Sequence, residues 1–155
     1  MISKEDLIGS WHLESWTIGY SDREDFTYPY GEEPEGLLLY TTDGWMSASI
    51  ARAGREALPE DVSYRKLPDA VKAGAFSSYF HYAGRYRVVD GDVIHQVTQS
   101  LNPNFPGTEQ LRHAELDGQT LVLSGKDQVG GATRFHSLVW HRAEATPDGV
   151  LIEDA

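Results

Sequence analysis

The segment SLNPNFPGTEQLRH, residues 100–113, carries an arginine on a face that ends in apolar residues. Arg112 shares its alternating face with Gln110 and Leu116, which is the two-residue period of a β-strand. If this face points into a core, the guanidinium needs a partner, because an unpaired buried charge is costly. No acidic residue falls on the faces that we assign to the interior. A carboxylate, enol or carbonyl group of a ligand is therefore the natural partner for Arg112.

Alternation in the neighbouring strands places further polar side chains on the same inner wall, which is otherwise mainly apolar. The polar residues expected there are Tyr82, Tyr86, His95, Gln99, Gln110 and Arg112. An apolar pocket with a few converging polar groups is the usual form of a small-molecule site. The same side chains could instead satisfy one another through hydrogen bonds and ordered water. The sequence leaves both interpretations open, and we name these residues as the candidate ligand-binding set.

One kind of catalysis would fit the same pocket. A cofactor-independent cyclase or isomerase needs a shaped apolar cavity, one acid/base group and an oxyanion stabiliser. His95 could transfer the proton, since the ordinary pKa of histidine is about 6.5. Tyr86 and Arg112 could polarise a carbonyl group. Binding of a small, mostly apolar molecule with a polar or acidic end is the main hypothesis. A cyclase or isomerase that acts on a small natural-product-like substrate in the same cavity is the alternative.

Other chemistries lack the residues that they require. The chain has no cysteine, and its histidines form neither an H-x-H nor an H-E-x-x-H pattern. The G-x-S-x-G turn of serine hydrolases is also missing from the sequence. Gly130-Gly131 does not stand in a strand–loop–helix unit that could hold a phosphate. We therefore expect no metal site and no cofactor.

The elements that must position these residues are short strands separated by turns. Asp-Gly pairs at residues 43–44, 90–91 and 117–118 are strong hairpin signals. The strands expected are residues 10–20, 36–41, 45–51, 82–89, 92–101, 108–116, 119–125 and 132–143. A short helix is expected within residues 67–82, between the third and fourth of these strands. An eight-stranded antiparallel up-and-down β-barrel buries one face and hides both edges, so we predict this all-β fold.

Strand registers follow from the turns. A two-residue turn at Asp90-Gly91 would place Tyr86 opposite His95 and Val89 opposite Asp92. The next two hairpins would place Arg112 beside Val97 and Leu123.

The first strand has a break in its alternation. Trp11 and Leu13 fall on one side of the strand, and Trp16 and Ile18 on the other. We therefore expect a bulge or a strong twist near Ser15.

Several segments resemble the small microbial lipocalin-like domain proteins. LIGSW places Gly9 and Trp11 in the G-x-W arrangement that opens lipocalin barrels, and Arg142 in LVWHR matches the late arginine that packs on that tryptophan. The blocks LIGSWHLESW, YPYGEEPEGLLLYTTDGWMSASI, YFHYAGRYRV and SLNPNFPGTEQLRH extend the resemblance over nearly the whole chain. The resemblance implies a single barrel with an interior cavity. Related barrels bind small lipophilic molecules, and some act as cyclases or isomerases.

Composition limits the class of partner. Lysine and arginine number 13 against 24 aspartate and glutamate residues, so the net charge is -11. Such a surface repels phosphate, and we expect neither nucleic acid nor a membrane as partner. A homodimer through an outer face such as the one with Trp16 and Ile18 is left open.

The two ends of the sequence suggest where the protein is located and where its domain ends. The start, MISKEDLIGSW, has no apolar stretch of signal-peptide length, so we expect a cytoplasmic protein. We expect the barrel domain to span residues 1–143 and a poorly ordered tail to span residues 144–155.

Overall fold

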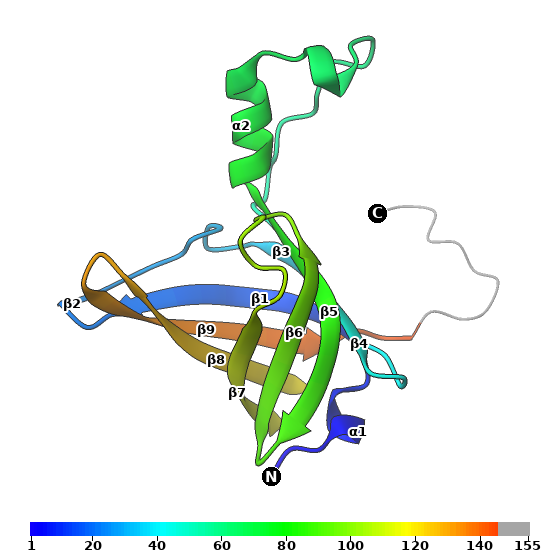
Figure 1. The fold of residues 1–155 in the computed structure, drawn as a ribbon, viewed down its shortest axis with the longest axis vertical. Coiled ribbons are helices and arrows are strands. Elements are labelled where there is room, and N and C mark those ends of the chain that lie inside the picture. Colours follow the sequence, from blue (N-terminus) through cyan, green and yellow to red (C-terminus); the bar gives the residue numbers. More distant parts are fainter. Residues whose placement is uncertain (146–155) are drawn as a thin grey trace.

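The computed structural model describes residues 1–145, which form an antiparallel barrel with a projecting helical segment (Figure 1). Most of the expected tail lies outside the described residues. The strands are β1 (Gly9–Tyr20), β2 (Arg23–Thr27), β3 (Glu35–Tyr40), β4 (Trp45–Ala51), β5 (Tyr79–Val89), β6 (Asp92–Ser100), β7 (Glu109–Asp117), β8 (Thr120–Val129) and β9 (Ala132–Arg142). The helices are α1 (Lys4–Leu7), the single 3-10 turn η1 (Tyr64–Lys66) and α2 (Asp69–Ser77).

Pairing of the first and last strands closes the sheet. β1 pairs with β9 from Trp11 opposite Arg142 to Tyr20 opposite Arg134. The remaining barrel strands follow in chain order from β3 to β9. Closure leaves the barrel without a free edge, and the apolar side chains of every barrel strand meet inside. The predicted eight-stranded antiparallel barrel is confirmed, with β2 as an additional strand.

The predicted position of the helix between the third and fourth strands is wrong. The segment Arg23–Thr27, which lies outside all the predicted strands, forms β2 against the end of β1, so α2 follows the fourth strand and precedes the fifth. All five residues of β2 are exposed, so this strand has no buried face to create an alternating pattern. The helix is also shorter than the segment that suggested it, because Tyr79 already belongs to β5.

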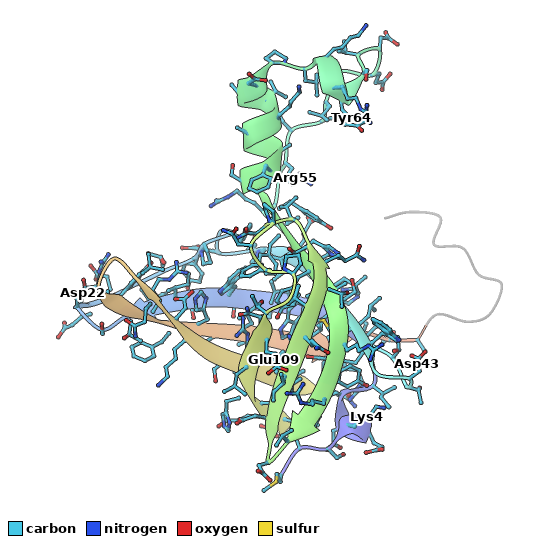
Figure 2. All side chains as sticks on the ribbon, in the orientation of Figure 1. Lys4, Asp22, Asp43, Arg55, Tyr64 and Glu109 are labelled. Atoms are coloured by element: carbon cyan, nitrogen blue, oxygen red, sulfur yellow. The ribbon has the colours of Figure 1, made fainter. Side chains whose placement is uncertain are left out.

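The projecting segment lies apart from the barrel interior. η1 and α2 extend from one end of the barrel, and Figure 2 places Tyr64 and Arg55 on this extension. Within residues 1–145 no helix is long and apolar enough to cross a membrane.

A bulge in β1 turns both tryptophan-containing halves of the strand inward. The register against β9 shifts between Leu13 and Ser15, as the broken alternation predicted. Trp11, Leu13, Trp16 and Ile18 are all buried in the core. The idea that Trp16 and Ile18 lie on an outer face for dimerisation is therefore wrong.

A second bulge, which the sequence analysis missed, lies between β5 and β6. Gly84 pairs with Val97 whereas Ala83 pairs with Gln99, so β6 contains one extra residue, Thr98. The backbones approach so closely that a Cβ atom on Gly84 would lie 1.9 Å from the Gln96 carbonyl oxygen. The extra residue reverses the alternation beyond it. Gln99 is consequently exposed on the outer face, and its predicted inward position is wrong.

Of the other predicted strand registers, the one between β5 and β6 is confirmed and the one between β6 and β7 is wrong. Tyr86 opposite His95 and Val89 opposite Asp92 are confirmed. Arg112 faces Val93 instead of Val97, because Val97 already pairs with Thr108 and the intervening residues form a longer loop.

The register between β7 and β8 differs by two residues from the predicted one, which placed Leu123 opposite Arg112. Asp117 pairs with Thr120, so the turn residues are Gly118-Gln119 and Leu123 faces Ala114. The registers between β6 and β7 and between β7 and β8 are both shifted by an even number of residues. Because side chains alternate with a period of two, the inward faces of β7 and β8 remain as predicted.

Candidate functional site

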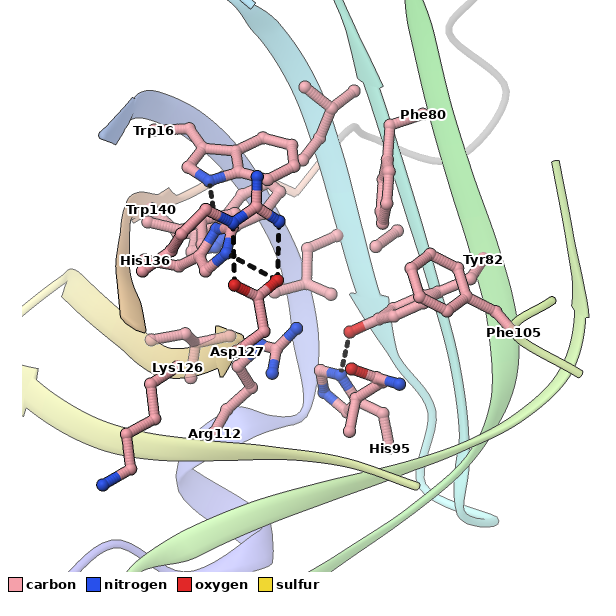
Figure 3. Close-up of a pocket in the computed structure, with 17 residues that line it drawn as sticks. Trp16, Phe80, Tyr82, His95, Phe105, Arg112, Lys126, Asp127, His136 and Trp140 are labelled. Carbon is pink, nitrogen blue, oxygen red and sulfur yellow. Dashed lines mark hydrogen bonds and ion pairs between the residues drawn. The ribbon is translucent and has the colours of Figure 1, made fainter. Parts of the chain in front are cut away.

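A cavity of about 180 Å³ lies inside the barrel, with side chains from all eight barrel strands in its wall (Figure 3). Apolar residues that form its wall include Trp16, Leu38, Ala48, Ile50, Phe80 and Leu123. A dry cavity of about 150 Å³ can hold a benzene molecule, so this space suits a molecule built on a single ring. Lys126 and Asp127 are exposed at the β8 side of the cavity, and the Lys126 ammonium points away from the other lining groups (Figure 3).

His95 connects two tyrosines at the polar side of this cavity. Its Nδ1 atom lies 2.6 Å from the Tyr82 hydroxyl, and its Nε2 atom lies 2.7 Å from the Tyr40 hydroxyl. Tyr40 comes from β3, Tyr82 from β5 and His95 from β6, so the contact between Tyr40 and His95 spans the barrel. His95 and Tyr82 line the cavity, as the sequence predicted for its inner wall.

Burial controls the protonation of this group. Burial, and to a lesser degree the charge of Arg112, lower the pKa of His95 from 6.5 to about 3. Burial also raises the pKa of Tyr82, against the opposing effect of Arg112, and raises the pKa of Tyr40 well above its usual value. All three side chains are therefore neutral at pH values near neutrality.

Arg112 reaches into the cavity from β7 and is half-buried. Its Nη1 atom donates to the carbonyl oxygen of Leu111 at 2.9 Å. Among residues 1–145, no carboxylate forms an ion pair with this guanidinium. Gly125 on β8 leaves room for it, because a Cβ atom there would lie 2.8 Å from Nη1 of Arg112. The predicted location of Arg112 on the inner wall is confirmed.

The other predicted residues separate into two groups. Gln110 lines the cavity, where its Nε2 atom donates to the Thr108 hydroxyl at 3.0 Å. Tyr86 is buried in the barrel core, but its hydroxyl donates to the carbonyl oxygen of Thr41 at 2.6 Å and the side chain does not belong to the cavity wall within the described chain. Gln99 lies outside the barrel. The structure thus brings together Tyr82, His95, Gln110 and Arg112.

A second polar cluster in the cavity was missed. Asp127 accepts two hydrogen bonds from Arg134, at 2.8 and 2.6 Å, and its Oδ2 atom lies 3.2 Å from Nε2 of His136. The indole of Trp16 donates to Nδ1 of His136 at 3.1 Å. Because Nδ1 accepts this bond, the Nε2–H of His136 donates to Asp127. Burial lowers the pKa of His136, and the Arg134 hydrogen bond lowers that of Asp127.

The cause of this omission is the length of a hairpin. The predicted strands end at residue 125 and resume at residue 132, whereas β8 continues to Val129 and β9 begins at Ala132. Gly130 and Gly131 adopt positive φ angles of 60° and 81°, which the tight turn requires. Asp127 and Arg134 are opposite charges placed symmetrically about this Gly-Gly pair, and that symmetry is the signal that predicts a cross-strand pair. The expectation of an inner wall without acidic residues is therefore wrong.

Metal binding finds no support in the part of the chain that the structure describes. No three histidine, aspartate or glutamate side chains gather there in a way that could hold an ion.

A closed antiparallel barrel around a mainly apolar cavity defines the class of small β-barrel proteins with an interior site. The model of the lipocalin-like domain family matches residues 8–143, and the chain belongs to this family. The chain is also similar to the 4'-hydroxy-3'-methoxypropiophenone carrier protein of Aspergillus oryzae. The two are 31% identical over 107 residues, which make up 63% of this chain and 96% of that relative.

Proposed function

We propose that this protein binds and carries a small, mostly apolar molecule with a polar or acidic end inside the barrel cavity. The observation that carries this proposal is the position of Arg112, a half-buried cation without an ion-pair partner in residues 1–145, at the side of an apolar cavity. A ligand oxygen in the cavity would supply the partner that residues 1–145 do not provide.

The charges at the cavity support an electron-rich ligand end. Arg112 and Arg134 bring two positive charges, and Asp127 brings one negative charge that Arg134 and His136 already engage. The surplus is positive although the whole protein carries a net charge of -11. A carboxylate, phenolate or carbonyl oxygen is favoured in such a field, whereas an ammonium group is not.

The size of the cavity and the similar carrier protein narrow the ligand class. That relative is named for carrying a propiophenone, which is an aryl ketone with a single ring. A cavity of about 180 Å³ matches a single substituted ring. We propose small aryl ketones and related aromatic acids as the first compounds to test.

Catalysis by a cyclase or isomerase has less support. The role of acid/base group was assigned to His95, but its pKa of about 3 makes it a weak base at neutral pH. Both of its ring nitrogens are also engaged by tyrosine hydroxyls. Tyr86, assigned to polarise a carbonyl, donates to Thr41 away from the cavity wall. Binding therefore fits the geometry better than turnover.

A titration with 4'-hydroxy-3'-methoxypropiophenone tests the proposal. Trp16 and Trp140 line the cavity, so we expect saturable quenching of tryptophan fluorescence, with one-to-one stoichiometry by calorimetry. Ala48→Met would fill part of the cavity and should weaken binding. The matched control is Ser47→Met, on the other face of the same strand.

Two results would contradict the proposal. The first is the absence of binding for aryl ketones and aromatic acids alike, with the protein shown to be folded by circular dichroism. The second is equal loss of affinity in Ala48→Met and Ser47→Met, because this would locate the ligand outside the cavity.

A further inference from the structure

The proton positions in the pair of hydrogen bonds around His95 can be assigned. A neutral imidazole has one N–H donor and one nitrogen that only accepts. His95 is neutral because it is buried, with 2% of its surface exposed. Its two ring nitrogens contact the hydroxyls of Tyr40 and Tyr82, so one tyrosine must donate to His95 and the other must accept from it.

Burial of Tyr40 decides which tyrosine donates. Tyr40 is 2% exposed, and in the described chain its hydroxyl has the Nε2 atom of His95 as its hydrogen-bond partner. If Nε2 carried the proton, the Tyr40 hydroxyl would accept it, and its own proton would be buried without an acceptor. A buried donor without a partner is strongly unfavourable. Tyr40 therefore donates to Nε2, and the proton of His95 resides on Nδ1.

This assignment determines the direction of the Tyr82 hydroxyl. The Nδ1–H of His95 donates to the Tyr82 oxygen at 2.6 Å, so the Tyr82 proton cannot point back to His95. Arg112, a charged group near Tyr82, has only donors to offer. Tyr82 lines the cavity, and Figure 3 shows its hydroxyl beside His95 at the cavity side. The space for the remaining proton is the cavity.

Most of the unused hydrogen-bonding groups in the cavity are also donors. The indole nitrogen of Trp140, which also lines the cavity, is buried without a hydrogen-bond partner in the described residues. The carboxylate of Asp127 already accepts from Arg134 and His136. Tyr82, Trp140 and Arg112 each offer an unused donor to the cavity, and the amide oxygen of Gln110 is an uncharged acceptor among the lining side chains.

We infer that the Tyr40–His95 pair directs the Tyr82 hydroxyl proton into the cavity, and that the ligand is recognised through a hydrogen-bond acceptor such as a ketone oxygen. The inference rests on the proposed function and specifies its chemistry. Tyr82 is the contact residue. Tyr40 and His95 are positioning residues, and Tyr40 is not among the described side chains that line the cavity.

The first test uses the protein without ligand. Nitrogen NMR of the histidine rings distinguishes the two neutral tautomers. We expect Nδ1 of His95 to carry the proton near neutral pH and Nε2 to accept. A His95 protonated on Nε2 would overturn the inference whatever the protein binds.

The second test compares propiophenone with propylbenzene, which has the same carbon skeleton without the ketone oxygen. We expect the native protein to prefer propiophenone roughly tenfold, the order of magnitude of one desolvated hydrogen bond. Tyr82→Phe should remove most of this preference while changing the affinity for propylbenzene little. Tyr40→Phe should reduce it, because Tyr82 could then turn its proton back to His95. Tyr64→Phe, on the projecting segment, is the matched control (Figure 2).

The carbonyl stretching frequency of bound propiophenone gives an independent readout. A hydrogen bond from Tyr82 should lower this frequency, and Tyr82→Phe should restore it. Equal affinity for both compounds in the native protein would refute the inference while leaving cavity binding intact. If phenylacetate also failed to bind along with these two compounds, the proposed function would be contradicted, and with it the inference about ligand recognition.

Discussion

The guanidinium of Arg142 lies 4.1 Å from the centre of the Trp11 indole ring, at the end of the barrel where α1 begins the chain. The same guanidinium donates to the carbonyl oxygens of Asp6 and Ile8 at 2.7 and 3.0 Å. Trp11 is fully buried, and its indole donates to the carbonyl oxygen of Leu7 at 2.9 Å. The packing of a late arginine on the G-x-W tryptophan, which the resemblance implied, is confirmed. It closes the end of the barrel and attaches α1 to it.

Removing this guanidinium should destabilise the fold. Arg142→Met keeps much of the aliphatic packing but loses the cation–π contact and leaves two carbonyl groups without their donor. We expect the free energy of unfolding to fall by about 1–3 kcal/mol. Denaturant titration measures the change, with Arg87→Met as a control. Arg87 forms an exposed pair with Glu109, so its loss should cost less than about 1 kcal/mol. Equal effects of the two variants would contradict this role of Arg142.

The bulge at Gly84 should tolerate no side chain. In Gly84→Ala the new Cβ atom would lie 1.9 Å from the Gln96 carbonyl oxygen, so the two strands must separate. We expect destabilisation of about 1–3 kcal/mol or more, because forced overpacking moves the backbone. Gly74→Ala in α2 is the control, since the space around Gly74 is open and alanine favours helix. Thermal unfolding of both variants measures the difference, and a neutral Gly84→Ala would show that the bulge is not required.

The pH dependence of stability should reflect His95. Burial, assisted by the charge of Arg112, lowers its pKa from 6.5 to about 3, so the unfolded chain binds a proton in this range that the folded protein does not. The free energy of unfolding should therefore decrease as the pH falls below about 6.5, by up to about 1.4 kcal/mol per pH unit from this residue. The lowered pKa of His136 acts in the same direction.

His113 provides an internal contrast in the same measurement. The hydrogen bond to Asp92 raises the pKa of this exposed histidine, so its stabilising contribution is present at low pH and is lost as the pH rises through the folded-state pKa. NMR titration should show the ring signals of His113 titrating above pH 6.5, while those of His95 stay constant over the same range. Titration of His95 near pH 6 in the folded protein would contradict its burial in a neutral state.

Arg112 should distinguish acidic ligands from neutral ones. Arg112→Met removes the cation but leaves an apolar side chain of similar length, so the cavity shape is largely kept. We expect the affinity for phenylacetate to fall roughly tenfold or more and that for propiophenone to fall less, because charge-assisted hydrogen bonds are the stronger ones. Calorimetric titration measures both. A uniform loss for the two compounds would indicate general damage to the barrel.

Much of the barrel could be predicted because its signals are local in the chain. Alternation has a period of two residues, and an Asp-Gly turn links neighbouring strands, so the Tyr86–His95 register followed from the positions of those residues alone. The inward faces of Arg112 and Gln110 were predicted for the same reason, although the register of β7 was not. The broken pattern around Ser15 even located the bulge in β1.

The remaining features depend on contacts between distant parts of the chain. Gln99 faces outward because the backbone of Gly84 packs against Gln96, and no pattern within β6 indicates such a bulge. Tyr40 meets His95 across the barrel interior, 55 positions apart in the sequence. Trp16 meets His136 through the pairing of the first and last strands. Local alternation assigns a side chain to a face, but its partners depend on the curvature, stagger and closure of the barrel, which arise from the packing of the whole sheet.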